Sequence, residues 1–343
     1  MGVQLGDLAS KEAISLDVLN GKTIAVDAFN TLYQFLSIIR QADGMPLVDM
    51  RGRITSHLSG LFYRSAKLLE VGIKPVYVFD GKPFHLKTET IEKRVEIRAE
   101  AERKWKDALA RGEAGEARTY AQGSSRLTSG MIAESKQLLT LMGIPYIEAP
   151  SEGEAEASHL AQIKSVYACA SQDYDALLFG APLLLRNLTI SGKRKLPGRD
   201  IYIDVSPELI NLENTLEQLK ISREQLVWLA ILTGTDFNQG IKGIGPKKAL
   251  KIVSKVSSLE DAFKEAAFPT SQMDELHEIE NFFLHPPVSE AQFAFREPEK
   301  AELVKFLCGE HGFSEARVEK IADTLKGAFE QKGSQSKLNS WFG

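Results

Sequence analysis

Short apolar runs that end at or shortly before an acidic residue alternate with helix-like stretches through the first half of the chain. The runs are Thr23–Asp27, Pro75–Asp80, Pro145–Glu148 and Val166–Ala170, with Leu183–Arg186 and Ile201–Asp204 as further candidates. Helical patterns cover Ser56–Val71, Ser129–Met142 and Glu154–Ile163. Apolar runs of this length are typical of parallel strands buried on both faces. We therefore expect an α/β fold, in which helices cover both faces of a mostly parallel central sheet and the active site lies beyond the carboxyl ends of the strands.

Residues 81–128 interrupt this alternation with a long, highly charged stretch that is poor in strand-forming residues. A helix is expected near Thr88–Arg111, but acids and bases alternate along it and no clear apolar stripe marks a core-facing side. One interpretation is an exposed helix held by ion pairs between residues four apart. The other is an arch or lid above the active site, because long insertions in compact domains often serve as lids.

Acidic residues stand near the ends of the expected elements, where they could face one cleft. They are Asp27, Asp80, Glu152, Glu154, Asp173, Asp175 and Asp236. Each has an ordinary explanation when taken alone: Ser151 and Glu154 fit a capping box, and the aspartates could cap helices or shape turns. Together they would repel one another, and hard cations such as Mg²⁺ would relieve that repulsion. Two such ions can clamp the attacking and leaving oxygens of a phosphodiester, so the acids predict a metal-dependent phosphoryl-transfer enzyme.

Other chemistries and locations lack their sequence signals. No histidines stand at CxxC or HExxH spacing for zinc, and no GxxxxGK[ST] loop indicates ATP use. There is no apolar run of the roughly 18 residues that a membrane span needs, and no secretory signal at the start. Cys169 lies in an apolar run, which favours a buried thiol over a disulfide. We expect an intracellular protein with no membrane partner.

The net charge of −4 hides a strongly uneven distribution. Residues 186–199 and 241–255 each carry several lysines or arginines and no acid, whereas the segment from Glu265 to Glu290 carries acids and neither Lys nor Arg. A single basic run is usually a solvated face. Two acid-free basic runs in one chain indicate positive strips that could hold nucleic-acid phosphates.

Five motifs in order resemble those of the flap endonucleases, in the family that includes the xeroderma pigmentosum group G nuclease. They read VDAFNTLYQFL, VFDGKPFHLK, APSEGEAEA, SQDYDALLFG and LTGTDFNQGIKGIGPKKAL. The resemblance covers Met1 to about residue 260 and resumes at the C-terminus, in an archaeal-type form that would work in the cytoplasm. It implies a 5′-flap endonuclease with 5′–3′ exonuclease activity, acting on branched DNA in Okazaki fragment maturation and base excision repair.

The resemblance also implies roles for individual residues. The seven acids match the metal ligands of the family, which hold two Mg²⁺ per active site. Lys87 and Arg94 match arch residues that contact the scissile phosphate, and a helix would place them on one face, two turns apart. Tyr33 matches an aromatic residue that stacks on a base, and Gly2 and Arg40 match DNA-contacting positions.

The segment GIKGIGPKKAL resembles the family's helix–turn–helix, which grips the duplex. Gly243 and Gly245 would let backbone N–H groups approach a phosphate, and Pro246 would begin a helix with a positive N-terminus. The lysines Lys247, Lys248 and Lys251 would add backbone contacts. Family members bind K⁺ here, although this chain has Gly240 where a serine ligand is common.

The C-terminal residues Gln335, Leu338, Trp341 and Phe342 match a sliding-clamp (PCNA)-binding peptide. Exposed Trp and Phe in a polar tail call for a partner that buries them. The expected organisation is a nuclease core over 1–270 with the arch at about 81–128 and the helix–turn–helix region at about 222–260. A C-terminal helical part over 271–330 and a flexible clamp-binding tail over 331–343 would follow, in a monomer.

Alternatives remain open at this point. A same-family nuclease could act on other junctions, although bubble cutters have a far longer insertion between the Asp80 and Glu152 motifs. A non-catalytic DNA-binding clamp adaptor would keep the lysines and the tail but would need no set of acids. An RNA-processing nuclease would also fit.

Overall fold

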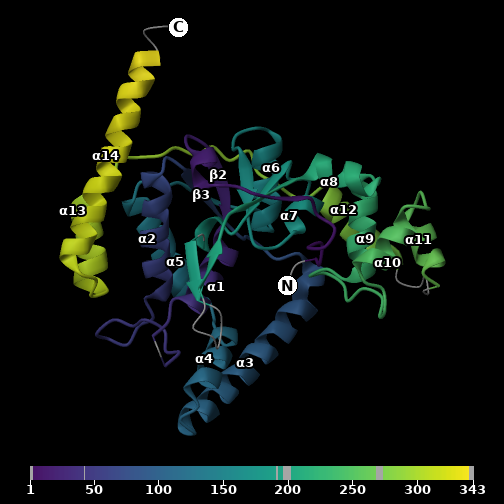
Figure 1. Cartoon of the computed structure of the whole chain (residues 1–343), viewed down its shortest axis with the longest axis horizontal. Helices are drawn as coiled ribbons and strands as arrows, with labels where there is room; N and C mark the ends of the chain where they lie inside the picture. The colour runs from purple at the N-terminus through teal and green to yellow at the C-terminus, as the bar shows by residue number, and fades with distance from the viewer. Residues whose placement is uncertain (1–2, 42, 191, 196–201, 268–272, 340–343) are drawn as a thin grey trace.

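The protein is described here from a computed structural model that covers residues 3–41, 43–190, 192–195, 202–267 and 273–339. Within these residues a central sheet has the strand order β1-β9-β6-β5-β2-β3-β4 (Figure 1). Its strands are β1 Lys11–Ala13, β2 Thr23–Asp27, β3 Lys74–Phe79, β4 Tyr146–Glu148, β5 Ala168–Ala170, β6 Leu183–Arg186 and β9 Glu208–Asn211. The strands from β6 to β4 run parallel, with β2 next to both β3 and β5. The predicted α/β fold with a mostly parallel sheet is therefore confirmed.

Two features of the sheet differ from the expectation. Strand β9 pairs antiparallel with β6, and β1 pairs antiparallel with β9, so one side of the sheet is mixed. The candidate strand Ile201–Asp204 does not join the central sheet. It corresponds to β8 (Tyr202–Val205), which pairs with β7 (Gly192–Lys195) in a separate two-stranded sheet. Alternation of apolar residues cannot distinguish these two pairings, because both leave a strand-like pattern.

Helices cover both faces of the sheet and extend beyond it. The N-terminal half contains α1 Ala28–Ile38, α2 Ser56–Glu70, α3 Thr88–Ala110, α4 Ala114–Gly123, α5 Ser129–Leu141, α6 Gly153–Gln162 and α7 Asp175–Leu178. The C-terminal half contains α8 Leu212–Leu219, α9 Arg223–Thr233, α10 Pro246–Val253, α11 Leu259–Glu265, α12 Met273–Leu284, α13 Lys300–Val304 and α14 Glu315–Asn339. Short 3₁₀ turns lie at Leu16–Leu19, His85–Lys87 and Leu188–Ile190, and a π-helical turn lies at Lys305–Glu310.

Two separate apolar cores hold these helices on the sheet. One core packs α6, α7 and α9 to α12 against one face, with Val76, Val78 and Cys169 among its strand residues. The other packs α1, α2, α5, α13 and α14 against the opposite face, with Ile24 and Val26 among its strand residues. Successive strand residues thus feed opposite cores, which explains why each strand is apolar throughout. Both cysteines are free, and Cys169 is buried as expected.

The arch is a hairpin of two helices, α3 and α4, that projects away from the body of the molecule (Figure 1). The first interpretation of its charge pattern, an exposed helix held by ion pairs, is confirmed. Along α3 the only fully buried residue is Ala108, and ion pairs join Lys93 to Glu89 at 2.7 Å and Lys104 to Glu100 at 2.7 Å. The helix is therefore solvated and salt-bridged, yet it begins at the edge of the expected active site.

The C-terminal part departs from a simple helix-and-tail arrangement. Helix α14 continues as backbone helix to Asn339, through the stretch expected to form the flexible tail (Figure 1). Within the described ranges, no helix has both the length and the apolar composition of a membrane span.

Candidate active site

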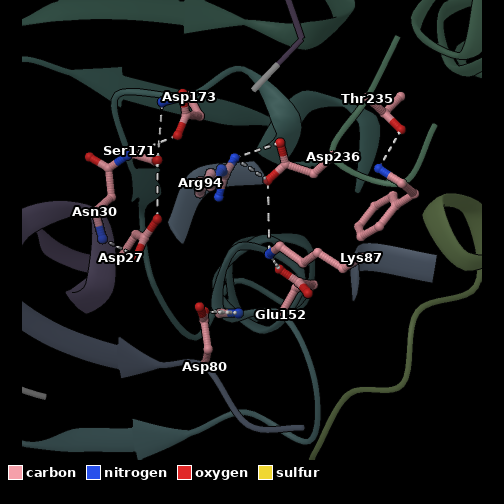
Figure 2. Close-up of polar contacts among 12 residues, drawn as sticks. Asp27, Asn30, Asp80, Lys87, Arg94, Glu152, Ser171, Asp173, Thr235 and Asp236 are labelled. Carbon is pink, nitrogen blue, oxygen red and sulfur yellow. Dashed lines mark hydrogen bonds and ion pairs between the residues drawn. The ribbon is translucent and has the colours of Figure 1, made fainter. Parts of the chain in front are cut away.

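The sheet brings the expected acids to one edge, each at the end of a structural element. Asp27 is the last residue of β2 and the N-cap of α1, and Asp80 follows β3. Glu152 is the N-cap of α6, and Glu154 lies in its first turn. Asp173 and Asp175 follow β5, and Asp236 follows α9. Figure 2 draws and labels five of these acids: Asp27, Asp80, Glu152, Asp173 and Asp236.

Asp27 and Asp173 are linked through two neutral polar residues, Asn30 and Ser171 (Figure 2). The Asn30 backbone N–H donates to Asp27 Oδ1 at 3.0 Å, and the Asn30 side chain donates to Asp173 Oδ2 at 3.0 Å. The Ser171 hydroxyl lies 3.3 Å from Asp27 Oδ2 and accepts from the Asp173 N–H at 3.2 Å. Sequence reasoning missed both residues. Asn30 stood three residues after Asp27, the position that an N-cap aspartate bonds, which was the available signal.

Backbone N–H groups fix two further acids. Gly153 donates to Asp80 Oδ1 at 2.8 Å, and Val3 donates to Asp175 Oδ1 at 2.8 Å. A Cβ atom at position 153 would lie 2.7 Å from Asp80 Oδ1, so only glycine lets Asp80 approach this closely. Gly153 is therefore a third residue of the site that sequence reasoning missed, although its place between Glu152 and Glu154 is conspicuous.

Two cations from the base of the arch reach the acids (Figure 2). Lys87, at the end of the 3₁₀ turn before α3, bonds Glu152 and lies 3.9 Å from Asp236 Oδ2. Arg94, two turns into α3, donates to both carboxylate oxygens of Asp236 at 2.7 Å. Lys87 thus precedes α3 and does not share its helix with Arg94, yet both side chains reach Asp236. Burial disfavours the charge on Lys87, but Glu152 and Asp80 outweigh it and raise the Lys87 pKa.

Burial and mutual repulsion raise the pKa values of the acids. The pKa of Asp27 is raised to about 8, by burial and then by the negative charge of Asp80. Burial and Glu152 raise the pKa of Asp80 to about 6. Besides burial, the negative charge of a neighbouring acid therefore raises the pKa of each of these two carboxyl groups.

Burial and neighbouring acids also raise the pKa values of Asp175 and Glu154. Burial, then Asp236 and Asp173, raise the pKa of Asp175 to about 7. Burial, then Asp175 and Asp27, raise the pKa of Glu154 well above its ordinary value. Because Glu154 is repelled by both Asp175 and Asp27, the charges of these acids act on one another, and the set forms a single electrostatic site.

The donor chemistry of this site fits a hard divalent cation. The set offers carboxylate oxygens only, and Glu154 Oε1 is buried with no hydrogen-bond partner among the described residues. An orphaned, buried carboxylate oxygen is costly unless a cation or water satisfies it. In the described part of the chain no group of three or more acids, histidines or cysteines stands close enough to hold an ion as arranged. Lys87 and Arg94 instead neutralise Glu152 and Asp236.

Two alternative explanations of the acids can be checked directly. The capping box expected from Ser151 and Glu154 is not formed, because Glu152 is the N-cap of α6 and no side chain caps it. The cap at Asp27 does exist, so this residue serves both the helix and the acid set. Glu156 is fully buried and turns away from the site to bond Ser289 N at 2.8 Å and its hydroxyl at 2.7 Å.

The expected DNA contacts near the arch have protein partners in this structure. The Tyr33 ring is half-buried, and the guanidinium of Arg98 from α3 lies over it at 4.5 Å from the ring centre. Arg40 donates to Leu36 O at 2.9 Å, Gly44 O at 2.8 Å and Ser125 Oγ at 2.8 Å. Arg40 thus ties α1 to the following loop and to the end of α4. Gly2 lies outside the described residues.

The helix–turn–helix region forms largely as the pattern indicates. Gly245 is the N-cap of α10 and Pro246 its first residue, while Gly243 has a φ of +85° with open space around it. Lys247, Lys248 and Lys251 are all exposed. Gly240 has a φ of +67°, and a Cβ there would lie 2.3 Å from Gly234 N, so a serine cannot stand at this position.

Two further expectations concern the C-terminal residues and the basic run at 186–199. Gln335 and Leu338 lie in the backbone helix α14, and Trp341 and Phe342 lie outside the described residues. The basic run at 186–199 is less open than expected where it is described. Arg186 donates to Tyr174 Oη at 2.7 Å and to Glu208 at 3.0 Å, so it is a structural ion pair.

Comparisons with known proteins place this geometry in a family. The XPG N-terminal domain model matches residues 1–101, and the XPG I-region model matches residues 143–236. A flap endonuclease 1 of Thermococcus onnurineus is 55% identical over all of this chain and 99% of its own length. The solved flap endonuclease-1 of Methanococcus jannaschii is 43% identical with a TM-score of 0.77, covering 96% of this chain and 100% of that one. The catalytic core of Rad2, solved with a DNA substrate, is 25% identical with a TM-score of 0.68, covering 95% of this chain and 100% of that one. The chain therefore belongs to the flap endonuclease 1 group of the XPG nuclease family, enzymes that hydrolyse phosphodiesters.

Proposed function

We propose that this chain cuts branched DNA close to the base of a 5′ flap, by metal-assisted hydrolysis of one phosphodiester bond. The proposal includes a 5′–3′ exonuclease activity and roles in Okazaki fragment maturation and base excision repair. The observation that carries it is a set of seven acids at the ends of separate elements, two of which, Glu152 and Asp236, form ion pairs with Lys87 and Arg94 from the arch. The flap endonuclease 1 names of full-length relatives support the substrate.

The acids are proposed to hold two Mg²⁺ ions, which when bound would supply Lewis-acid chemistry at the scissile phosphate. Glu154, with its orphaned carboxylate oxygen, and the buried Asp27 and Asp175 are the strongest candidates for direct ligands. The hydrogen bonds from Gly153 to Asp80 and from Asn30 to Asp27 would hold those carboxylates in fixed orientations.

Lys87 and Arg94 are proposed to exchange partners when DNA binds. In this structure Lys87 forms an ion pair with Glu152, and Arg94 forms one with Asp236. A phosphate placed between the arch and the acids would offer oxygens to the same cations. The guanidinium of Arg94 bonds both oxygens of one carboxylate, and the same fork geometry suits two oxygens of a phosphate. The two side chains would then stabilise the negative charge that develops during cleavage.

DNA binding is proposed to rest on shape and phosphates rather than on base sequence. The open glycine turn at Gly243 and the positive N-terminus of α10 suit a phosphate, with Lys247, Lys248 and Lys251 around them. Tyr33 would stack on a base after Arg98 leaves its ring. A K⁺ ion at this turn would need oxygens other than a serine at position 240, which the backbone excludes.

We also propose that Gln335, Leu338, Trp341 and Phe342 bind a sliding clamp inside the cell. Binding would require the end of α14 to rearrange, because Gln335 and Leu338 now lie within a continuous helix. The nuclease itself is proposed to act as a monomer.

Cleavage of an end-labelled 5′-flap duplex in Mg²⁺ and in EDTA tests the proposal, beside single-stranded and four-way-junction controls. We expect metal-dependent cutting within about a nucleotide of the flap junction and little cutting of the controls. Preferential junction cutting would keep the chemistry and change the substrate. Loss of all cutting in Mg²⁺ would leave a DNA-binding adaptor as the function.

A substitution separates chemistry from binding. Asp175→Ala should abolish cutting while flap binding, measured by fluorescence anisotropy in EDTA, stays micromolar or tighter. Because Asp175 also accepts a bond from Val3, Asp175→Asn is the companion variant that preserves more of this contact. Cutting by both variants at near the wild-type rate would contradict the assignment of the acids.

A further inference from the structure

The segment after the helix–turn–helix carries no recognisable motif. One of its residues, Phe282, nevertheless packs against the rings of Phe84 and Phe237, which lie close to Lys87 and Asp236 in the sequence. Phe282 of α12 is buried, with 5% of its surface exposed. Its ring stacks on Phe84 at a centroid distance of 4.1 Å and an interplanar angle of 10°. It also meets the edge of Phe237 at 5.2 Å, and Phe84 meets Phe237 at 5.4 Å. The three rings therefore form a closed triangle.

Each partner of Phe282 is joined to a residue of the proposed active site. Phe84 stands at the start of the 3₁₀ turn whose last residue is Lys87, and its carbonyl accepts the Lys87 N–H at 2.9 Å. Phe237 directly follows Asp236, and the Lys87 ammonium lies 6.0 Å from the centre of its ring. The two rings that Phe282 contacts thus belong to the turn that carries Lys87 and to the turn that carries Asp236.

Helix α12 is itself anchored, so Phe282 sits on a fixed support. Glu280 accepts a bond from the indole N–H of Trp228 in α9, and His277 lies 2.7 Å from Glu260 of α11. On the arch side, Glu278 lies 3.4 Å from His85 in the same 3₁₀ turn as Lys87. The helix therefore connects the duplex-binding half of the protein to the base of the arch.

We infer that Phe282 is a positioning residue for cleavage: its ring sets the distance between the Lys87 turn and the Asp236 turn. Lysine has a long, flexible side chain, so its ammonium is only as well placed as the backbone turn that carries it. Aromatic pairs prefer offset-stacked or edge-to-face arrangements and gain free energy from them beyond the burial of apolar area, which a branched aliphatic side chain cannot reproduce. A leucine at position 282 would keep an apolar contact but lose both ring geometries.

The neighbouring Phe283 provides a matched control. It is fully buried and contacts the rings of Phe179 at 4.9 Å and Phe237 at 5.3 Å. Among the described ring contacts it has none with Phe84, so it lacks the link to the Lys87 turn. Phe282→Leu and Phe283→Leu therefore remove a similar volume from one core, and only the first removes a ring contact with Phe84.

The test is single-turnover cleavage of a 5′ flap at saturating enzyme, with flap affinity and thermal unfolding measured on the same samples. The inference rests on the proposed role of Lys87, so Lys87→Ala is measured first and alone. Phe282→Leu should slow cleavage about tenfold with flap affinity within about twofold of wild type, and Phe283→Leu should slow it far less. In the Lys87→Ala background, Phe282→Leu should cause no further slowing, because its effect acts through Lys87.

Each outcome decides one of the two ideas. Lys87→Ala cutting at the wild-type rate would refute the proposed role of Lys87, whatever Phe282 does. If Lys87→Ala is slow, the positioning role is refuted by Phe282→Leu at the wild-type rate, by equal slowing in Phe283→Leu, or by full additivity with Lys87→Ala. If Phe282→Leu does not fold, Phe84→Leu is measured in its place, alone and in the Lys87→Ala background. Phe84 is only half-buried, and the same outcomes then support or refute the positioning role.

Discussion

The close contact between Gly153 and Asp80 leads us to predict that even one added methyl group at position 153 displaces the Asp80 carboxylate. In Gly153→Ala the new Cβ would lie 2.7 Å from Asp80 Oδ1, whereas ordinary contact begins at 3.4 Å. The Val78 carbonyl oxygen would lie 3.2 Å from the same Cβ, so the Cβ cannot move toward it to avoid the clash. Asp80 must therefore retreat by roughly 0.7 Å, and the bond from the Gly153 N–H at 2.8 Å is strained or lost.

The expected cost falls on activity and not on folding. Misplacement of a catalytic group by about 1 Å can cost about 10²-fold in rate, and loss of a bond that orients a metal ligand costs about 10–100-fold in metal affinity. We therefore expect Gly153→Ala to cut a 5′ flap about 10–100-fold more slowly and to need more Mg²⁺. Position 153 is in the first turn of α6 with an ordinary backbone conformation, so alanine should change the unfolding free energy by no more than about 1 kcal/mol.

The assay is a Mg²⁺ titration of single-turnover flap cleavage, with thermal unfolding in EDTA. Gly130→Ala is the matched control, because Gly130 is the second residue of α5 and its Cβ would meet nothing nearer than Thr128 Oγ1 at 3.8 Å. A Gly153→Ala variant with the wild-type rate and Mg²⁺ dependence would show that the position of Asp80 does not limit the reaction.

Three further predictions concern charge, DNA and the tail. The folded pKa of Asp27 is raised to about 8, so its contribution to stability is present below its unfolded pKa of about 4 and is lost as the pH rises toward 8. In EDTA the wild-type unfolding free energy should fall over that window by an amount on the order of a few kcal/mol, and Asp27→Asn should flatten the decline; an unchanged slope would contradict the burial argument. Replacing Lys247 and Lys248 by alanine should lower the slope of log K against log salt for flap binding by about 2, and an unchanged slope would remove them from the interface. Deleting Gln335–Gly343 should leave cutting of free flaps unchanged and abolish stimulation by the sliding clamp, so equal stimulation of the truncated protein would disprove the tail assignment.

The parts of the fold that sequence could predict are those governed by local pattern. Strand β2 begins at Thr23 and ends at Asp27 as expected, and α2 and α5 begin at the expected residues. The acids followed from the same pattern, because a polar residue at the carboxyl end of a parallel strand falls on a common edge. Lys87 and Arg94 were implied by the resemblance to the flap endonucleases, and both reach Asp236.

The parts that escaped depend on contacts between distant residues. Nothing local in Phe282 distinguishes it from Phe283, and the stacking on Phe84 spans almost two hundred positions. The bond from Asn30 to Asp173 and the clash that forces glycine at 153 exist only after the strands have paired. The assignment of β8 to the central sheet failed for a related reason, because strand propensity does not specify a partner.

The hairpin construction of the arch has a consequence for its length. Helices α3 and α4 leave and rejoin the body at one end, and their far tip is the short exposed link at Arg111–Glu113, where Gly112 has a φ of +76° with open space around it. Lengthening a solvent-exposed connection costs little, since the entropic penalty of closing a loop grows only with the logarithm of its length. A longer or shorter hairpin is therefore compatible with the same sheet, the same two cores and the same acids, so its length is a variable that the fold leaves free.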